Sequence, residues 1–356
     1  MQHTTVMVTG VGGGAIGGQI LSALSQATTP YRVVAADAQP FSHGLYLGHE
    51  SVVLPLASRP EYISAVLDCI RRFGVNALIP GTEAELNRLV PHASTLQGHG
   101  CTLVANPEPV VALCAHKGRL TQWLLEHGFS TPKTADAGNW RALLEETGFP
   151  LVGKPAMDTG GSKGVRLLCD TAEVEEFLAL TRGELLLQEY VADGDSEYTV
   201  GIMADKDGAL IDSIVIHRKL TGLSLGTTRT HAGKTYSLST GISQGFVVTN
   251  PFIQRRCEEL VLAMGGRGPM NVQCRLSRND IQVFEVHARF SGTCAIRASA
   301  GFNEVDLLLR NFLTGERFGR IPYARDVAAI RGLSHVLVPR HAYRGEFPEE
   351  PCEPSW

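Results

Sequence analysis

Several features are missing from this 356-residue sequence, and each absence narrows the possibilities. Eight cysteines are scattered without a CxxC pair, which argues against a zinc site or a disulfide framework and fits reduced thiols in the cytoplasm. Basic residues form no long run and the formal net charge is −4, so no nucleic-acid footprint is present. No apolar run approaches the ~18 residues of a membrane-spanning helix. We therefore expect a cytoplasmic protein with neither a membrane nor a nucleic-acid partner.

The composition suits a globular protein of more than one domain. Hydrophobic residues make up 44% of the chain and charged residues 19%, which is enough for a sizeable core and for two or three domains. The sequence enters a strand-like segment at Thr5–Val8 without a basic stretch before an apolar one. We therefore expect no secretion signal.

Residues 1–105 alternate between strand-like and helix-like segments. One helix begins with a capping-box sequence, Ser58-Arg-Pro-Glu61, and Gly74 is placed to end it. The alternation predicts a parallel sheet that helices cover on both faces. The expected strands are Val6–Val8, Arg32–Ala36, Val75–Ile79 and Cys101–Val104, and the expected helices are 15–27, 58–73 and 83–97.

The first strand is followed by a glycine-rich turn, Gly12–Gly17, that satisfies G-x-G-x-x-G, and Asp37 lies at the end of the second strand. This is the spacing of a dinucleotide fingerprint, which predicts NAD(P) at the helix N-terminus. The same residues also suit a tight strand-to-helix turn that binds no dinucleotide. Because residues 113–313 do not resemble a dehydrogenase substrate domain, we favour the second interpretation and expect that NADH does not bind.

After about residue 113 the pattern changes to mixed and then mostly antiparallel structure. Lys206–Gly208 is a hairpin signal between two strand-like segments. Residues 221–248 are rich in Gly, Thr and Ser, which predicts a long functional loop. The other expected elements are helices at 117–127, after the cap Asp170–Glu173, after Asn250-Pro251 and at 303–313, and strands at 150–155, 165–168, 184–191, 197–203 and 209–216.

A predicted hairpin at residues 270–290 carries an unusual set of polar side chains. Every second residue of a strand projects to the same side, so these side chains share one face. Oxygen donors, an imidazole and a guanidinium suit a metal ion that bridges a polyphosphate, and they fit poorly in a buried core. The face carries Gln273, Glu285, His287 and Arg289.

A second phosphate signal precedes this hairpin. Lys154 stands at the end of an apolar strand, where a lysine either extends to the surface or contacts a phosphate. The loop Asp158–Gly164 follows, and its glycines, Ser162 and Lys163 supply backbone and side-chain donors. A flexible surface loop is the alternative, but the combination with the later acidic hairpin favours a polyphosphate site.

With these motifs in this order, the chain resembles the ATP-grasp superfamily, and within it the carboxylate–amine ligases and the ATP-binding halves of carbamoyl-phosphate synthase. The resemblance spans roughly residues 1–315. It implies an α/β fold in which ATP lies between two lobes that follow a Rossmann-like domain. The implied units are a Rossmann-like pre-ATP-grasp domain at 1–112, a small α+β lobe at 113–190, a large antiparallel lobe at 191–340 and a Pro- and Glu-rich tail at 341–356.

The resemblance also implies roles for individual residues. Those that would bind ATP are two lysines, the glycine-rich phosphate lid, the linker at the adenine edge and a carboxylate at the ribose: Lys117, Lys154, Gly160, Gly161, Ser162, Glu189, Tyr190, Val191 and Glu197. The implied metal ligands are Gln273, Glu285 and His287, and the implied catalytic cations are Arg289, Lys154 and Arg297.

The metal ligands depart from the family pattern. The family usually has Glu-x-Asn on the last strand, whereas this chain has Glu285-Val286-His287, and Gln273 stands where Glu is common. Imidazole is a softer ligand than the amide oxygen of Asn. Three interpretations remain open: a site for Mg²⁺ or Mn²⁺ that tolerates His, a second metal ion held mainly by the nucleotide, or a degenerate site. We favour the first two.

Three further groups are candidates for substrate contacts. Arg297, with Ser291–Thr293, is suited to hold a carboxylate or its acyl phosphate. Glu83 lies at the carboxyl end of a strand, where it either contacts substrate or favours the helix dipole. The third group, which either binds an anionic substrate or is simply solvated, is His217, Arg218, Lys219, His231 and Lys234.

The resemblance implies an ADP-forming ligase. ATP would phosphorylate a small-molecule carboxylate, and an amine would displace phosphate from the acyl phosphate to form an amide or peptide-like bond. The alternatives are phosphorylation of bicarbonate or carbamate, a non-catalytic nucleotide-binding subunit, and an NAD-dependent oxidoreductase. Homo-oligomers are common in the family, and the sequence does not decide the oligomeric state.

Overall fold

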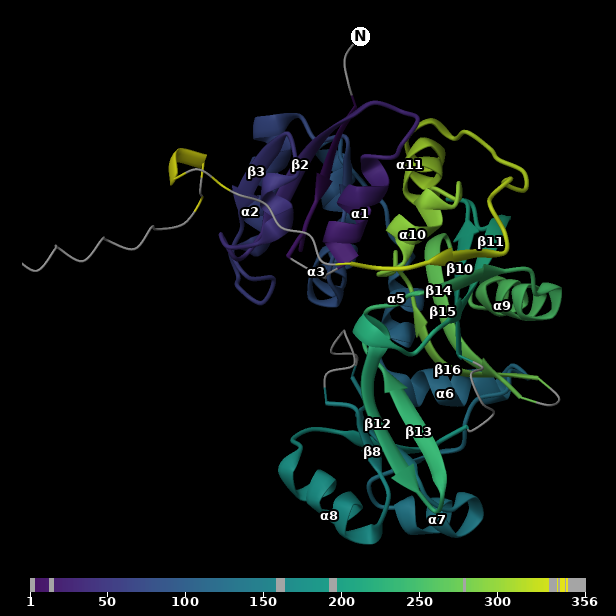
Figure 1. The fold of residues 1–356 in the computed structure, drawn as a ribbon. Helices are drawn as coiled ribbons and strands as arrows, with labels where there is room; N and C mark the ends of the chain where they lie inside the picture. Colours follow the sequence, from purple (N-terminus) through teal and green to yellow (C-terminus); the bar gives the residue numbers. More distant parts are fainter. Residues whose placement is uncertain are drawn as a thin grey trace, which may run out of the picture.

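The computed structural model describes residues 4–12, 16–157, 164–191, 197–277, 280–332, 338, 340–342 and 344 (Figure 1). The glycine-rich residues 160–162 and most of the tail at 341–356 lie outside these residues. Within the described part, no helix combines the length and apolar character needed to cross a membrane.

The N-terminal sheet is entirely parallel, with the strand order β3-β2-β1-β4-β5, as the strand–helix alternation predicts. Its strands are β1 (Thr4–Val8), β2 (Tyr31–Asp37), β3 (Glu50–Val53), β4 (Ala77–Ile79) and β5 (Thr102–Leu103). The associated helices are α1 (Ile16–Leu24), η1 (His43–Tyr46), α2 (Tyr62–Phe73), α3 (Glu83–Leu89), η2 (Val90–His92) and α4 (Ala93–Gly98).

The predicted capping box at Ser58–Glu61 is wrong. Helix α2 begins at Tyr62, and its N-cap residue Glu61 makes no side-chain capping bond. The preceding residues instead form tight turns, in which the backbone N–H of Arg59 donates to Leu56 and that of Tyr62 donates to Arg59. The predicted stop at Gly74 is confirmed, since this residue is left-handed with φ 62°.

Helices from the C-terminal part cover one face of the N-terminal sheet, which the sequence pattern did not predict. Helices α10 (Cys294–Ser299) and α11 (Glu304–Thr314) lie beside α1 (Figure 1). They complete one hydrophobic core with side chains such as Val6 and Ile20. The Asp306 carboxylate accepts from the Tyr31 hydroxyl at 2.8 Å, so a polar contact also ties the two parts together.

A four-stranded antiparallel sheet of order β6-β9-β7-β8 forms the small lobe. The Asp170 side chain caps α8 by accepting from Glu173, as predicted. The elements of this region are α5 (Glu108–Cys114), α6 (Lys117–Glu126), β6 (Thr134–Asp136), α7 (Trp140–Thr147), β7 (Leu151–Pro155), β8 (Arg166–Leu168), α8 (Thr171–Leu180) and β9 (Leu185–Glu189).

The large lobe is a six-stranded antiparallel sheet of order β16-β15-β10-β11-β14-β17. Asn250 caps α9, as predicted. The apolar side chains of α5 and α6 pack into the core of this sheet. The elements are β10 (Glu197–Ala204), β11 (Leu210–Arg218), β14 (Gly245–Val248), α9 (Pro251–Ala263), β15 (Gly268–Leu276), β16 (Ile281–His287) and β17 (Val327–Ala329). The short helix η4 (Arg340–Ala342) lies instead beside the N-terminal domain, near Tyr46 and Ser51.

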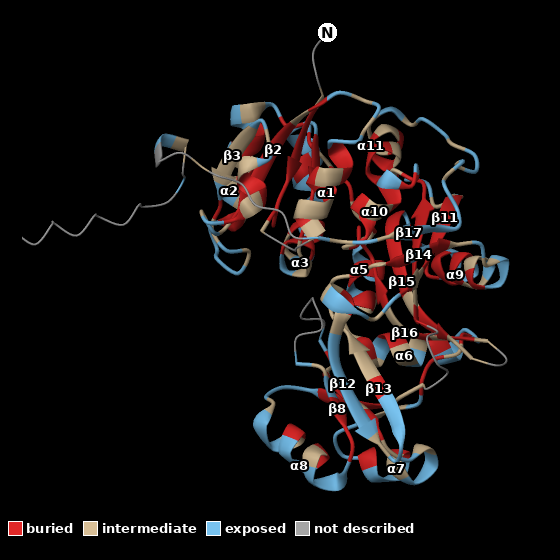
Figure 2. Ribbon diagram, viewed as in Figure 1, coloured by how far each residue is buried: buried red, intermediate tan, exposed pale blue. Residues whose placement is uncertain are grey.

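The predicted long loop at 221–248 is wrong, because most of it is a hairpin. After η3 (Gly222–Ser224), strands β12 (Leu225–His231) and β13 (Lys234–Ser239) pair in an antiparallel register. This hairpin, largely exposed in Figure 2, reaches the small lobe, where Tyr236 packs with Leu167 and Cys169. It therefore joins the large lobe to the small one.

The seven cysteines of the described residues are all free and buried, as expected of small core residues.

Candidate functional site

The hairpin β15–β16 brings its predicted polar side chains together. Gln273 faces Glu285 across the strands, and its Nε2 donates to Oε2 of Glu285 at 3.1 Å. The same nitrogen lies 3.2 Å from Nε2 of His287. A terminal guanidinium nitrogen of Arg289 lies 3.2 Å from Nδ1 of His287. The four side chains thus form one chain of contacts.

Two lysines from other elements face this hairpin. Lys117, the first residue of α6, places Nζ 3.8 Å from Oε1 of Glu285. Lys154 on β7 is 6% exposed, and its Nζ donates to Oε1 of Gln188 at 2.8 Å and to the Phe284 carbonyl at 3.4 Å. Burial lowers the pKa of Lys154 to about 8; Glu285 raises this pKa and Lys117 lowers it further. A buried ammonium held by neutral oxygens is suited to gain an anionic partner.

A cavity of about 830 Å³, including its open mouth, lies between the small and large sheets. That volume is in the range of small-molecule sites. The lining combines Lys117, Lys154 and Glu285 with apolar and aromatic side chains, and it also includes the ion-paired Glu197 and Arg275. Its walls include Lys117, Pro132, Val152, Lys154, Val165, Gln188, Glu189, Tyr190, Val191, Glu197, Leu238, Ser239, Gln273, Arg275, Phe284 and Glu285.

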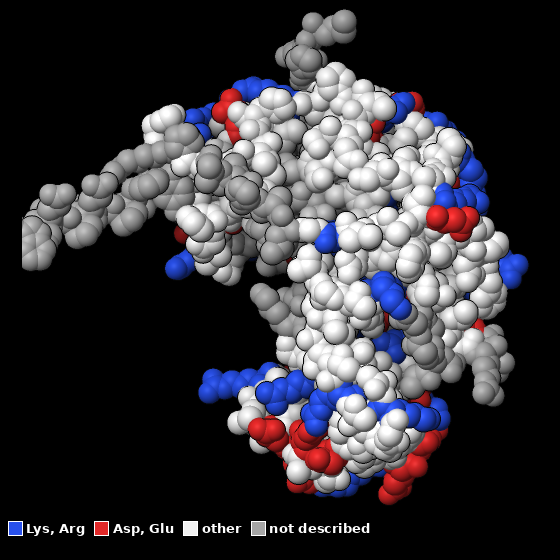
Figure 3. Space-filling view, in the orientation of Figure 1, with Lys and Arg blue, Asp and Glu red and all other residues white. Residues whose placement is uncertain are grey.

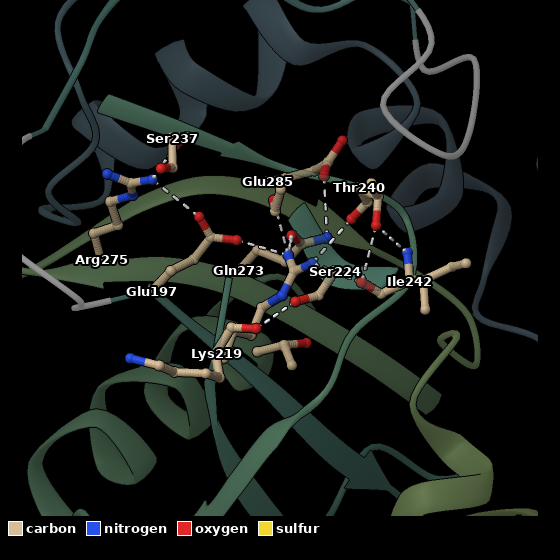
Figure 4. Close-up of polar contacts among 12 residues, drawn as sticks. Glu197, Lys219, Ser224, Ser237, Thr240, Ile242, Gln273, Arg275 and Glu285 are labelled. Carbon is tan, nitrogen blue, oxygen red and sulfur yellow. Dashed lines mark hydrogen bonds and ion pairs between the residues drawn. The ribbon is translucent and has the colours of Figure 1, made fainter. Parts of the chain in front are cut away.

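Glu197 lies between Arg218 and Arg275, which stand on the two strands next to β10; its contact with Arg275 is drawn in Figure 4. Arg218 on β11 donates to Oε1 of Glu197 at 2.6 Å, and Arg275 on β15 donates to Oε2 at 3.0 Å. Glu197 and Arg275 are directly paired in the register of β10 and β15. Both oxygens of the carboxylate predicted to bind ribose are therefore engaged, and a ribose hydroxyl would have to share them.

The linker predicted to meet the adenine edge lines the same cavity. The Glu189 carboxylate accepts from the backbone N–H of Lys133 at 2.9 Å. The Tyr190 hydroxyl donates to the Ser237 carbonyl at 2.8 Å, which ties the linker to β13. The Arg275 guanidinium lies 4.5 Å from the Tyr190 ring centre and donates to the Val191 carbonyl at 2.8 Å.

The N-terminal domain contributes Glu83 to the hairpin site. Glu83 stands in the first turn of α3, and its carboxylate accepts from Nε of Arg289. Its Oε1 also lies 3.4 Å from Nδ1 of His287. The sequence suggested two roles for Glu83, contact with substrate or a favourable interaction with the helix dipole. The structure adds a third role, because Glu83 joins the N-terminal domain to the hairpin.

Glu285 and His287 are spaced as two ligands of one metal ion would be. Oε2 of Glu285 lies 3.3 Å from Nε2 of His287, close to the ~3 Å between two atoms that each lie ~2.1 Å from Mg²⁺. Gln273 fits less well, because its amide nitrogen faces this pair while its Oε1 accepts from Arg218 at 3.3 Å. Turning the amide over would set its NH₂ group against the guanidinium. The geometry therefore argues against Gln273 as an oxygen ligand.

Arg297 does not fit the substrate-binding role given to it from the sequence. Its side chain is fully buried, and its NH1 donates to Oε1 of Glu304 at 2.9 Å. Its NH2 donates to Oδ1 of Asn271 at 2.6 Å. The charge is compensated inside the protein, so Arg297 holds α10 and α11 to the large sheet and does not present a cation to a ligand.

The acidic residue of the dinucleotide fingerprint, Asp37, already has partners within the protein. The Asp37 carboxylate accepts from the backbone N–H of Gly12 at 2.8 Å and from that of Gln39 at 2.9 Å. A dinucleotide ribose would compete with both bonds. The structure thus supplies an internal role for the acidic residue of the fingerprint.

Sequence reasoning missed Arg275 and the contact of Gln188 with Lys154. A signal for Arg275 existed, because it stands two residues after Gln273 and so faces the same side of β15. No comparable local signal indicates that Gln188 accepts from Lys154, since the contact depends on the pairing of β7 with β9. Gly160, Gly161 and Ser162 lie outside the described residues.

Two family models match the sequence. One, described as "PylC-like, N-terminal domain", matches residues 7–104, and the other, "ATP-grasp in the biosynthetic pathway with Ter operon", matches residues 181–336. The chain belongs to the ATP-grasp superfamily. As an ATP-grasp protein it has a PylC-like parallel N-terminal sheet followed by antiparallel sheets, in agreement with the predicted fold class.

Curated relatives of this ATP-grasp protein are distant and longer. The carbamoyl phosphate synthase large chain of Haemophilus ducreyi is 24% identical over 63% of this chain and 21% of its own length. The C-terminal section of the Aquifex aeolicus large chain is also 24% identical, over 66% of this chain and 43% of its own length. The chain thus spans less than half the length of either relative.

Solved structures share the fold. The biotin carboxylase domain of Hydrogenobacter thermophilus 2-oxoglutarate carboxylase has a TM-score of 0.64 at 16% identity, covering 91% of this chain and 73% of that one. L-amino acid ligase from Bacillus licheniformis has a TM-score of 0.62 at 19% identity, covering 88% and 75%.

Proposed function

We propose that this protein is a cytoplasmic, ADP-forming ligase that activates a small-molecule carboxylate with ATP for attack by an amine. The observation that carries the proposal is the cavity between the lobes, where Lys117 and Lys154 face Glu285 and the apolar side chains of the lining suit a base. The polyphosphate of ATP needs cations and a metal ion, and its adenine base needs an apolar pocket.

In the proposed reaction, a carboxylate oxygen attacks the γ-phosphorus of ATP, and the bond to ADP breaks. The amine nitrogen then attacks the acyl carbon, phosphate leaves, and the nitrogen loses a proton. Lys117 and Lys154 would hold the phosphates, and Arg289 would stabilise charge on the transferred group. Gly160, Gly161 and Ser162 are proposed, on sequence grounds alone, as the loop over the phosphates.

Glu285 and His287 would hold Mg²⁺ or Mn²⁺, which would neutralise phosphate charge. Among the described residues, no group of three His, Cys, Asp or Glu side chains could hold a metal ion by itself. Phosphate oxygens and water would therefore complete the metal shell.

The names of two solved structures support nucleotide binding. On the surface in Figure 3, Lys and Arg side chains form a band across the region of β12, β13 and the small lobe with Asp and Glu side chains directly below it, so the charge there is mixed. The Hydrogenobacter thermophilus domain was solved with MgADP and bicarbonate, and the Bacillus licheniformis protein is named an L-amino acid ligase. These names motivate both the nucleotide and the substrate classes proposed here.

The test is a screen for ADP release with carboxylates against amines, run with Mg²⁺ and with Mn²⁺. Some acid–amine pair should release ADP and phosphate in equal amounts, and Lys154→Ala should abolish the release. Lys133→Ala is the matched control, because this lysine of the same lobe is half exposed and its ammonium pairs with the exposed Glu146. Release of AMP, or normal turnover by Lys154→Ala, would contradict the proposal.

The rival reaction is phosphorylation of bicarbonate or carbamate, which the carbamoyl phosphate synthase relatives suggest. Bicarbonate with ammonia therefore belongs in the screen. ADP release that requires bicarbonate and no other acid would favour this rival. ATP binding without turnover by any pair would favour a non-catalytic nucleotide-binding subunit.

A further inference from the structure

Arg331 stands between the large lobe and the N-terminal domain. It follows β17, whose pairing with β14 fixes the backbone two residues earlier, at Ala329. Its NH1 donates to Oε1 of Gln19 on α1 at 2.9 Å, and its NH2 donates to the carbonyl of Gly292. The guanidinium thus bridges α1 and the turn that follows Arg289.

Arg331 differs from the two other arginines around this turn in its ion-pair partners. Arg289 pairs with Glu83, and Arg297 pairs with Glu304. Among the described residues, Arg331 has no carboxylate partner, and both of its acceptors are neutral amide oxygens. Its Nε is buried and makes no hydrogen bond within the described part of the chain.

Within the described residues, the positive charge of Arg331 therefore has no carboxylate beside it to neutralise it. Burial lowers the pKa of Arg331, against a small opposing effect of Cys294. Even so, a guanidinium stays protonated at any physiological pH. An anion that reached it would gain charge-assisted hydrogen bonds in a partly desolvated place, which are stronger than those made in water.

We propose that Arg331 binds a carboxylate group of the acid substrate. Gly292, which accepts from Arg331, is three residues beyond Arg289, so the chain between them spans roughly 10 Å at most. A bound acid could thus extend from Arg331 toward the phosphoryl group that Arg289 is proposed to face. The planar fork of a guanidinium matches a carboxylate, and the role assigned to Arg297 from the sequence passes to Arg331.

This inference rests on the proposed ligase function, but its test does not need turnover. Acetate serves as the probe of the carboxylate class, with acetamide as its neutral counterpart and chloride as the ionic-strength control. Thermal melting of the full chain with MgADP should show a saturable upward shift with acetate, roughly 1–2 °C at five times the apparent dissociation constant. Acetamide and chloride should give no saturable shift.

Arg331→Met should weaken the acetate response roughly tenfold or more, and Arg331→Lys should retain part of it. The matched control is Arg325→Met, which changes an exposed arginine of the same segment that stacks on Tyr323. Unchanged MgADP affinity in Arg331→Met shows that the variant is folded.

Three results would overturn the proposal: no saturable acetate shift in the wild type, an equal shift in Arg331→Met, or a larger Arg331-dependent shift with inorganic phosphate than with acetate. The last would assign the guanidinium to a phosphate. Failure of the ADP screen together with an Arg331-dependent acetate shift would refute the ligase and leave the carboxylate site in place.

Discussion

Glu83 and Arg289 are 206 residues apart in the sequence and form an ion pair, with side chains only 14% and 8% exposed. The carboxylate comes from the N-terminal domain and the guanidinium from the strand end of the hairpin site. The pair holds Arg289 beside His287 and makes the position of the hairpin depend on the N-terminal domain.

Replacing Glu83 by Gln should lower the rate of ADP formation by roughly 10- to 100-fold with a smaller change in the KM for ATP, because Arg289 loses its orienting partner. Glu108→Gln is the control, since Glu108 is also a first-turn carboxylate, on α5, and is exposed. If both variants behave alike, Glu83 acts only on the helix dipole.

Nucleotide affinity should fall as the pH rises above 8. Burial lowers the pKa of Lys154 to about 8, so the free protein loses this positive charge above that pH. Nucleotide phosphates favour the charged form, so binding takes up a proton there and Kd rises by up to about tenfold per pH unit. Calorimetric titration with MgADP from pH 7 to 9.5 measures this. Lys154→Arg should flatten the profile, and a flat wild-type profile would exclude the mechanism.

Glu197→Gln should destabilise the protein by about 3–5 kcal/mol, because Arg218 and Arg275 would share a neutral amide in a buried place. Urea unfolding monitored by circular dichroism measures the change. Glu175→Gln removes an exposed pair with Arg141 and should change stability by no more than about 0.5 kcal/mol. Equal effects in the two variants would show that the buried cluster does not stabilise the fold.

Glu85→Gln should stabilise the protein at pH 8 and have little effect at pH 4.5. Burial raises the pKa of Glu85 from 4.5 to about 7, against the opposing hydrogen bond from Thr82. The folded state therefore binds the proton more tightly, and stability falls as the pH rises from 4.5 to 7, by up to about 3 kcal/mol. Urea midpoints at both pH values test this, with the exposed Glu61→Gln as the control.

His287→Asn should shift metal preference toward Mg²⁺, because an amide oxygen is a harder ligand than imidazole. The ratio of ADP formation with Mg²⁺ to that with Mn²⁺ should rise severalfold. A ratio that stays constant would place His287 outside the metal shell, and loss of all activity with intact MgADP binding would give His287 another role.

The sequence was sufficient to predict those features that depend on a local pattern of residues. The shared face of Gln273, Glu285 and His287 follows from the two-residue period of strands, and the stop of α2 at Gly74 follows from the freedom of glycine to adopt positive φ. These features depend on residues that are near one another in the chain.

The sequence pattern was insufficient to predict contacts that depend on the pairing of segments far apart in the chain. The arrangement of Arg218 and Arg275 around Glu197 requires three strands in one register, which no single segment specifies. Most of β12 is exposed, so the sequence of the hairpin at 225–239 shows no alternation of apolar and polar residues. Its Gly, Thr and Ser content therefore favoured the prediction of a loop. The pairing of Arg297 with Glu304 depends on the packing of α10 with α11 and could not be read from Arg297 alone.

The cover that α10 and α11 place on α1 has a consequence during synthesis. The apolar residues of the N-terminal sheet on that side, including Val6 and Ile20, pack against residues of 294–309. The N-terminal sheet therefore leaves the ribosome with the apolar residues of one face exposed. At ~5–20 residues per second, synthesis of the helices that cover this face follows on the order of tens of seconds later. We infer that this segment needs a chaperone, or transient shielding by its own chain, until residues 294–309 have been translated.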